Sequence, residues 1–230
     1  MATSFTQSLR TPNEDVWNTL LGNRFVAAMS DASLPLESFR FYIEQNLIYL
    51  PAYARVLGFG AARSNNLSEL ERFSGSIRQI VDVEIGQNQQ LRDRIITAGA
   101  ADSGGNLEAS PACLAYTSYL LATAATGSAL DIMAVTLPCA WSYHEIAVQY
   151  PNPEPHPVYA EWLGFFASDE YGTYLKKLLH ELDRLAGYVA QDDLDRLQRH
   201  FRAGARLEFG FWEMGVSMQR WPDAGRDVDE

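Results

Sequence analysis

The chain has 230 residues, 47% hydrophobic and 20% charged, a composition typical of a folded globular protein. Asp and Glu number 29 against 18 Lys and Arg, a formal net charge of −11. Such an acidic surface repels nucleic-acid phosphates and anionic lipids, so we expect neither nucleic acid nor membrane as a partner. The two cysteines make no disulfide framework and no CxxC pair, and the N-terminus lacks a signal-peptide pattern, so we expect a cytoplasmic protein.

Apolar residues recur at helical spacing along nearly the whole chain, and no alternating or β-branched run indicates a strand. In chain order we expect helices at 13–30, 36–63, 67–98, 110–126, 128–149, 157–166, 168–190 and 192–220. The Gly/Ser/Asp-rich segment 99–111 predicts a loop, and the repeated prolines of 150–159 predict a stiff crossover. The expected fold class is all-α, a multi-helix bundle forming a single domain over 1–230, with a short acidic tail from about residue 223.

The second expected helix carries an unusual polar stripe. Tyr42, Asn46, Tyr49 and Tyr53 follow one another at spacings of three and four, beside a separate apolar stripe. A solvent face more often carries Lys and Glu. The stripe fits polar groups that meet a ligand, and it fits equally well phenols that cover the core and turn their hydroxyls to water.

Residues 110–143 contain a single charge, Asp131, and approach the length of a membrane span. Gly127-Ser128 divides this stretch, and Pro138 interrupts its second half. Ser110-Pro111 and Ser128 are helix-start signals. We therefore expect two buried helices that form an antiparallel hairpin, not a transmembrane segment.

Cys139 follows Pro138 within this hairpin. Tyr116 and Cys139 lie about equally far from the turn, so antiparallel helices would bring them to the same level of the bundle. Tyr143 is one turn beyond Cys139 on the same face. The thiol could be a packing residue or a nucleophile, and the hairpin pattern leaves both interpretations open.

The last helix places Glu208 within its apolar face, one turn from Trp212. A carboxylate packed against an indole has a raised pKa, which suits a general acid or base. The alternative is an exposed Glu208 paired with Arg202 or Arg206. The adjacent His-Glu pairs cannot chelate one metal, and no ExxH pair occurs, so we expect neither a metal nor a haem cofactor.

Four motifs occur in order along the chain: QNLIYL at 45–50, AYTSYLL at 115–121, PCAWSY at 138–143 and EFGFWEM at 208–214. With these motifs the chain resembles the TenA family (thiaminase II, aminopyrimidine aminohydrolase) over nearly its full length. The resemblance implies a haem-oxygenase-like helical bundle, assembled as a homotetramer, with no cofactor. It also implies a hydrolase that breaks a C–N bond at the exocyclic methylene of a thiamin-derived aminopyrimidine. The product would be hydroxymethylpyrimidine for thiamin salvage.

By this resemblance the nucleophilic cysteine falls on Cys139 and the acid/base glutamate on Glu208. Substrate-binding positions fall on Asn46, Tyr49, Tyr116, Tyr143, Phe166 and Phe211.

Two positions depart from the family's pattern. Asn46 stands where members commonly carry Asp, so it can pair with a neutral aminopyrimidine but cannot supply charge. Phe166 stands where many have Tyr, which removes a pocket hydroxyl. These changes favour an altered substrate over a dead enzyme. A non-catalytic binder of a flat heterocycle is the main alternative, and a different reaction on the same fold, as in the quinone-cofactor synthase and oxidase relatives, is another.

Overall fold

The structure is a computed structural model that describes residues 4–104, 107–150, 156–186 and 189–222. Within these ranges it contains helices and no strand. The α-helices are α1 (Phe5–Arg10), α2 (Glu14–Leu21), α3 (Arg24–Ser30), α4 (Leu36–Ala62), α5 (Leu67–Arg78), α6 (Ile85–Thr97), α7 (Pro111–Thr126), α8 (Ala129–Gln149), α9 (Pro157–Phe166), α10 (Asp169–Leu185) and α11 (Gln191–Ser217). A 3₁₀ turn (Thr11–Asn13) links α1 to α2, and a π-helical turn (Gln79–Glu84) links α5 to α6.

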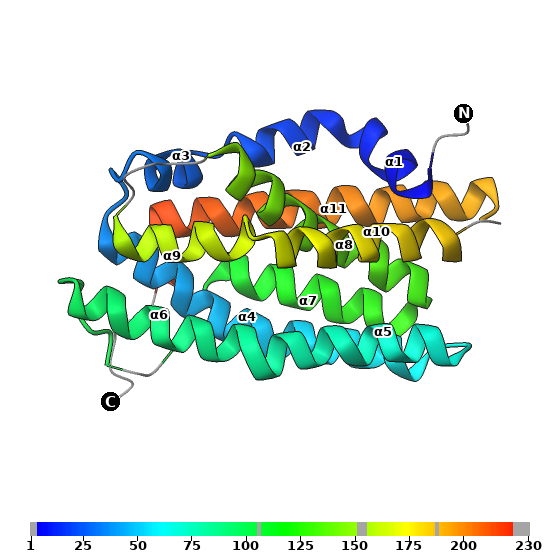
Figure 1. Ribbon diagram of the computed structural model, residues 1–230, viewed down its shortest axis with the longest axis horizontal. Coiled ribbons are helices and arrows are strands. Elements are labelled where there is room, and N and C mark those ends of the chain that lie inside the picture. The colour runs from blue at the N-terminus through cyan, green and yellow to red at the C-terminus, as the bar shows by residue number, and fades with distance from the viewer. Residues whose placement is uncertain (1–3, 105–106, 151–155, 187–188, 223–230) are drawn as a thin grey trace.

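Most long helices run along the longest axis of the molecule (Figure 1). Helices α1 to α3 cover one side of the bundle, α5 and α6 the opposite side, and α9 and α10 run between them. Within the described chain, 13–30 is two helices rather than the single helix we predicted. The break follows Gly22, where the Asn23 side chain caps α3 by accepting from the backbone N–H of Val26 at 2.9 Å.

Other differences lie at helix ends. Helix α1 was not predicted, and it is held by an N-cap at Ser4 and by Asp183 of α10, which accepts from the backbone N–H of Thr6 at 2.7 Å. Helix α10 ends at Leu185, and α11 ends before Met218, which has a left-handed φ of 48°. Half of the predicted crossover (151–155) and the acidic tail (223–230) lie outside the described residues.

The predicted hairpin forms from α7 and α8, with Ser110 and Ser128 as the helix caps. Helix α11 packs against both helices, and its Gly204 lies in close contact with α8. A Cβ added at Gly204 would lie 2.4 Å from the carbonyl oxygen of Val135. Among the described residues, no helix is both long and apolar enough to cross a membrane.

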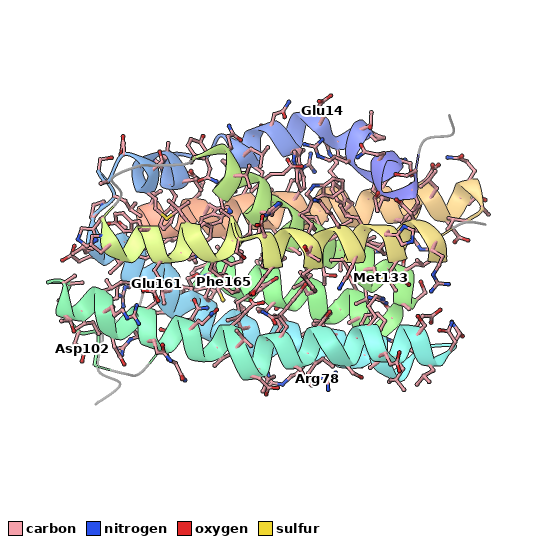
Figure 2. All side chains as sticks on the ribbon, in the orientation of Figure 1. Glu14, Arg78, Asp102, Met133, Glu161 and Phe165 are labelled. Atoms are coloured by element: carbon pink, nitrogen blue, oxygen red, sulfur yellow. The ribbon has the colours of Figure 1, made fainter. Side chains whose placement is uncertain are left out.

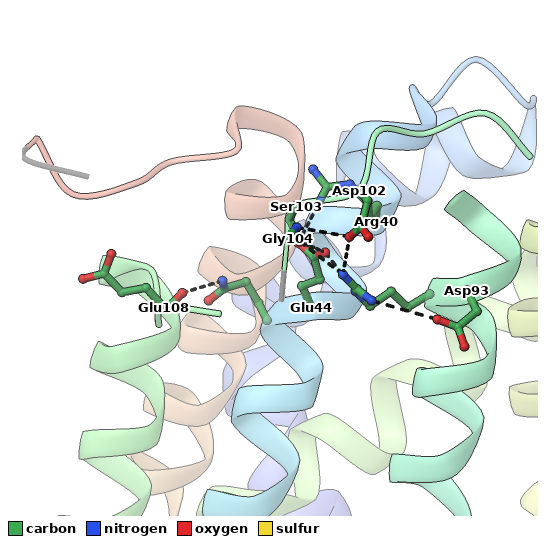
Figure 3. Close-up of polar contacts among 9 residues, drawn as sticks. Arg40, Glu44, Asp93, Asp102, Ser103, Gly104 and Glu108 are labelled. Atoms are coloured by element: carbon green, nitrogen blue, oxygen red, sulfur yellow. Dashed lines mark hydrogen bonds and ion pairs between the residues drawn. The ribbon is translucent and has the colours of Figure 1, made fainter. Parts of the chain in front are cut away.

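A buried ionic cluster fixes one end of α4 (Figure 3). The Glu44 carboxylate, 2% exposed, accepts from Arg40 at 2.6 Å, from Arg92 of α6 at 3.1 Å and from Ser103 at 2.6 Å. Arg92 also donates to Asp102 at 2.8 Å. The predicted loop is therefore tied to α4 and α6 through its first residues.

Candidate active site

A cavity of about 90 Å³ opens between α4, the π turn with α6, α8, α9 and α10. Its volume is well below the ~300–1,000 Å³ typical of pockets for drug-sized ligands, so it suits a small ring. Figure 2 labels Glu161 and Phe165, which extend from α9 towards α6 at this cavity. It is lined by Asn46, Tyr49, Leu50, Tyr53, Ile80, Glu84, Gln87, Asn88, Leu91, Cys139, Ala140, Tyr143, Glu161, Trp162, Phe165, Phe166, Tyr171 and Tyr174.

Five of the eight predicted site residues line this cavity: Asn46, Tyr49, Cys139, Tyr143 and Phe166. Three helices supply these residues. The polar stripe of α4 and the Cys139 face of α8 both border the cavity, and α9 adds Phe166. The ring centroids of Tyr143 and Phe166 are 4.9 Å apart and edge-on. A flat ligand would therefore meet aromatic side chains beside the Cys139 thiol.

The position of Phe166 depends on a histidine for which no role was predicted. His144 of α8 hydrogen-bonds through Nδ1 to the Phe166 carbonyl oxygen at 2.8 Å and so fixes the end of α9. Gly172 of α10 leaves room for this imidazole, since an added Cβ would lie 3.1 Å from its Cε1.

The other three predicted residues, Tyr116, Glu208 and Phe211, form a layer behind the cavity wall. The Tyr116 hydroxyl donates to Oε2 of Glu208 at 2.7 Å. Phe211 packs against both Tyr49 and Tyr116, with ring centroids 5.6 and 6.4 Å away. These residues support the cavity from the α11 side.

Glu208 is 1% exposed, so the alternative of a solvent-facing ion pair is wrong. Arg202 instead binds Asp15, at 2.7 Å. Burial raises the pKa of Glu208 from 4.5 to about 7, an effect that the hydroxyls of Tyr116 and Tyr143 partly offset. A carboxyl group with this pKa can both take up and release a proton near neutral pH.

Burial also raises the pKa of the Cys139 thiol well above its ordinary value, and the Glu208 and Glu84 carboxylates raise it further. The thiol is therefore protonated at rest and needs a base before it can act as a nucleophile. Cys113, the other cysteine, is buried in α7, where its Sγ contacts the Gln45 carbonyl oxygen at 3.7 Å.

Two tyrosine hydroxyls differ in their bonding. Tyr143 and Tyr42 share a hydrogen bond of 2.8 Å between their hydroxyl oxygens. The Tyr49 hydroxyl is buried and has no hydrogen-bond partner among the described residues. An unpaired buried hydroxyl beside a cavity is available to a polar ligand atom.

Sequence reasoning missed Glu84, which enters the cavity from the π turn, and Trp162, whose ring centroid lies 5.4 Å from that of Tyr143. A signal for Glu84 was present in the run Ile80, Glu84, Asn88 and Leu91, which shares one helical face. In the described ranges, no group of three His, Cys, Asp or Glu side chains is arranged to hold a metal ion.

The model of the TENA/THI-4/PQQC family matches residues 14–218, a range that contains every cavity-lining residue. The chain belongs to this family. An aminopyrimidine aminohydrolase from Halalkalibacterium halodurans is 33% identical over 222 residues, which cover 95% of this chain and 98% of that protein. An aminopyrimidine aminohydrolase from Bacillus subtilis is 24% identical over 228 residues, or 98% of this chain and 96% of that protein.

Solved structures show the same fold for this TENA/THI-4/PQQC member. A TenA homologue from P. horikoshii OT3 superposes with a TM-score of 0.82 at 28% identity, covering 94% of this chain and 99% of that one. A Shewanella denitrificans domain with a heme oxygenase-like fold superposes with a TM-score of 0.71 at 13% identity, covering 95% and 94% of the two chains. The predicted all-α, haem-oxygenase-like bundle is confirmed.

Proposed function

We propose that this chain hydrolyses the C–N bond at the exocyclic methylene of a thiamin-derived aminopyrimidine, with Cys139 as nucleophile and Glu208 as acid and base. The chain is a hydrolase of the thiaminase II type, the class to which its relatives named aminopyrimidine aminohydrolase belong. The observation that supports the chemistry best is the placement of a thiol in an aromatic cavity with a carboxyl group of pKa about 7 behind it.

The raised pKa values indicate the order of proton movements. The Glu208 carboxylate accepts the proton of the Cys139 thiol, and the resulting thiolate adds to a carbon of the pyrimidine ring. Glu208 then gives this proton to a ring nitrogen, which takes up the electron pair displaced by the addition. Burial favours the neutral thiol, whereas a pKa of about 7 leaves part of Glu208 ionised near neutral pH and able to accept the proton.

Loss of ring aromaticity lets the ring electrons expel the amine from the methylene, with the C–N electron pair leaving on nitrogen. Water adds to the exposed methylene carbon and loses a proton, which gives the hydroxymethyl group. Elimination of the thiol then restores the ring and frees Cys139. The net reaction replaces the amine by hydroxyl and consumes one water.

Asn46, Tyr49 and Tyr143 are the proposed polar contacts of the ring. Asn46 is 7% exposed in the stripe of α4, so its amide can pair with a ring nitrogen and the neighbouring amino group. An aspartate at this position would favour a protonated, more electrophilic ring. We therefore expect Asn46→Asp to accelerate turnover of a substrate that the native amide activates only weakly.

The test is a mass-spectrometric turnover assay with thiamin and, separately, the aminomethyl pyrimidine. We expect release of hydroxymethylpyrimidine by the wild-type protein and by Cys113→Ser, which changes a thiol outside the cavity, but none by Cys139→Ser. Absence of product from both compounds, also with Asn46→Asp, would exclude thiamin salvage as the function.

The raised pKa of Cys139 also favours a second candidate, a protein that binds a pyrimidine without turning it over. This candidate predicts that hydroxymethylpyrimidine raises the melting temperature while the wild-type protein and Cys139→Ser show equal, zero turnover.

A further inference from the structure

A carboxylate other than Glu208 lines the cavity from the π turn that precedes α6. Glu84 is the last residue of the π turn Gln79–Glu84, and it lies on the same face as Ile80 and Asn88, which also line the cavity. Asn88 donates from its side chain to the backbone carbonyl oxygen of Glu84 at 2.8 Å. Single π turns of this kind occur frequently at functional sites because they redirect a side chain within a continuous helix.

The cavity supplies no positive charge to Glu84. None of the described lining residues is Lys, Arg or His. The other lining carboxylate, Glu161, is paired with Arg94. Arg92, the next arginine of α6, is held by Glu44 at 3.1 Å and by Asp102 at 2.8 Å. Glu84 itself forms no ion pair within the described part of the chain.

Aromatic rings surround this unpaired carboxylate. Tyr53, Tyr171 and Tyr174 line the same cavity, and burial raises the pKa of the Tyr171 hydroxyl, an effect to which the Glu84 charge adds. A half-buried carboxylate beside ring faces is an environment that attracts an organic cation, because both the charge and the rings are electron-rich. The same groups disfavour an anion.

Glu84 also acts electrostatically on the proposed nucleophile, since its carboxylate contributes to the raised pKa of Cys139 after burial and Glu208. The two residues thus belong to one small cavity of about 90 Å³. A ring placed against Cys139 and Asn46 fills the α4–α8 side of this space. A substituent that leaves the ring towards the α6 side would meet Glu84.

We propose that Glu84 binds the positively charged amine of the substrate and makes this site selective for ammonium-bearing pyrimidines over neutral ones. This inference rests on the proposed function and gives different tasks to Glu208, which lies behind the cavity wall, and Glu84, which lines the cavity. Glu208 exchanges protons with the thiol and the ring, whereas Glu84 holds the departing group. An amine that already carries three protons leaves as neutral ammonia, with the C–N electron pair on nitrogen, and needs no further acid.

Burial without a partner raises the pKa of Glu84 from 4.5 to about 7. A bound ammonium group would supply the missing counter-charge and favour the ionised carboxylate. The titratable side chains that share the cavity with Glu84 are Tyr49 and Tyr53 of α4, Cys139 and Tyr143 of α8, Glu161 of α9, and Tyr171 and Tyr174 of α10.

The experiment is calorimetric titration of Cys139→Ser protein, which cannot turn over, with the aminomethyl and the hydroxymethyl pyrimidine slightly above neutral pH. Glu84→Gln in this background should weaken binding of the aminomethyl compound at least about tenfold and that of the hydroxymethyl compound less than about twofold. Asp82→Asn is the matched control, since Asp82 lies on the same π turn with its side chain exposed. It should alter neither affinity.

Equal weakening of both ligands by Glu84→Gln, or no change in either, would overturn the role of Glu84 while leaving the proposed function in place. If neither pyrimidine binds the Cys139→Ser protein, the proposed function fails, and the amine site fails with it.

Discussion

Burial raises the pKa of Glu208, which suits this residue to proton transfer and makes the stability of the protein depend on pH. It is 1% exposed and bonded to Tyr116, and no basic side chain is paired with it in the described ranges. Its ionisation therefore carries a desolvation penalty that Tyr116 and Tyr143 reduce only in part. The same penalty that makes Glu208 a proton acceptor near neutrality destabilises the fold once the pH rises.

The sign of this effect follows from the raised pKa. Glu208 keeps its proton in the folded state up to about pH 7, whereas in the unfolded chain it loses it near 4.5. Stability therefore falls as pH rises between these values, by about 3 kcal/mol in total. Glu208→Gln should remove this loss, raising the melting temperature above pH 7 but not below pH 4.5, while turnover drops about 100-fold or more.

Melting curves recorded across this window for both proteins provide the measurement. Glu213→Gln is a control on the same helix, because Glu213 pairs with the exposed Arg24 at 2.9 Å. A Glu208→Gln protein less stable than wild type at every pH would show that the buried carboxyl group stabilises the fold in its charged form.

The candidate site residues could be predicted from the sequence motifs. Which of them line the cavity and which lie behind it could not. Cys139 and Tyr143 are adjacent to the cavity as expected, whereas Glu208 and Tyr116 support it from behind. Local spacing gives the face of a helix, but the depth of a side chain depends on how three helices pack. Glu84 was missed because its spacing with Ile80 and Asn88 looks like that of an ordinary polar helix until the π turn is seen to direct the side chain into the cavity.

At the scale of elements, the packing of α11 against α8 holds the site together. These helices carry Glu208 and Cys139, and they are in close contact at Gly204, where only a hydrogen fits against the Val135 carbonyl oxygen. Pro138 lies on the same contact, 3.1 Å from the added Cβ. The proline beside the proposed nucleophile is thus also part of the helix interface.

Gly204→Ala should force α8 and α11 apart and destabilise the protein by about 1–3 kcal/mol. Gly210→Ala is the matched substitution on the same helix, since an added Cβ there meets nothing within 4 Å. It should stabilise the protein by about 0.5–1 kcal/mol through helix propensity. Denaturant unfolding of both variants measures these changes in the free energy of unfolding. Equal changes in the two variants would rule out a close contact at Gly204.

Helix existence could be predicted from apolar periodicity and caps, as the α7–α8 hairpin shows. The break between α2 and α3 was missed although Gly22-Asn23 is a helix-end and N-cap signal, because the apolar spacing continues across it. Helix α1 is short, and contacts with α10 and α11 outweigh its weak intrinsic signal.

At the scale of the whole molecule, the homotetramer remains a proposal that rests on family resemblance. Exposed apolar side chains on the α5–α6 side, Leu67 at 67% and Val81 at 51%, are compatible with a contact between copies. Light scattering should give the mass of four 25.7 kDa chains. A single-chain mass at micromolar protein would exclude the tetramer.

The family and the fold were accessible from four short motifs and the helical pattern, because motif order along a chain is specific even when each motif is weak. The source of the new oxygen atom in the product distinguishes the possible reactions. Hydrolysis takes the new oxygen from water, whereas an oxidative reaction on the same fold would take it from dioxygen.

The most direct test is turnover of the aminomethyl pyrimidine in water enriched in heavy oxygen, with the product weighed by mass spectrometry. We predict one heavy oxygen atom in hydroxymethylpyrimidine formed by the wild-type protein and no product from Cys139→Ser. Product that carries oxygen from dioxygen, or that Cys139→Ser still forms at the wild-type rate, would contradict hydrolysis through a cysteine adduct.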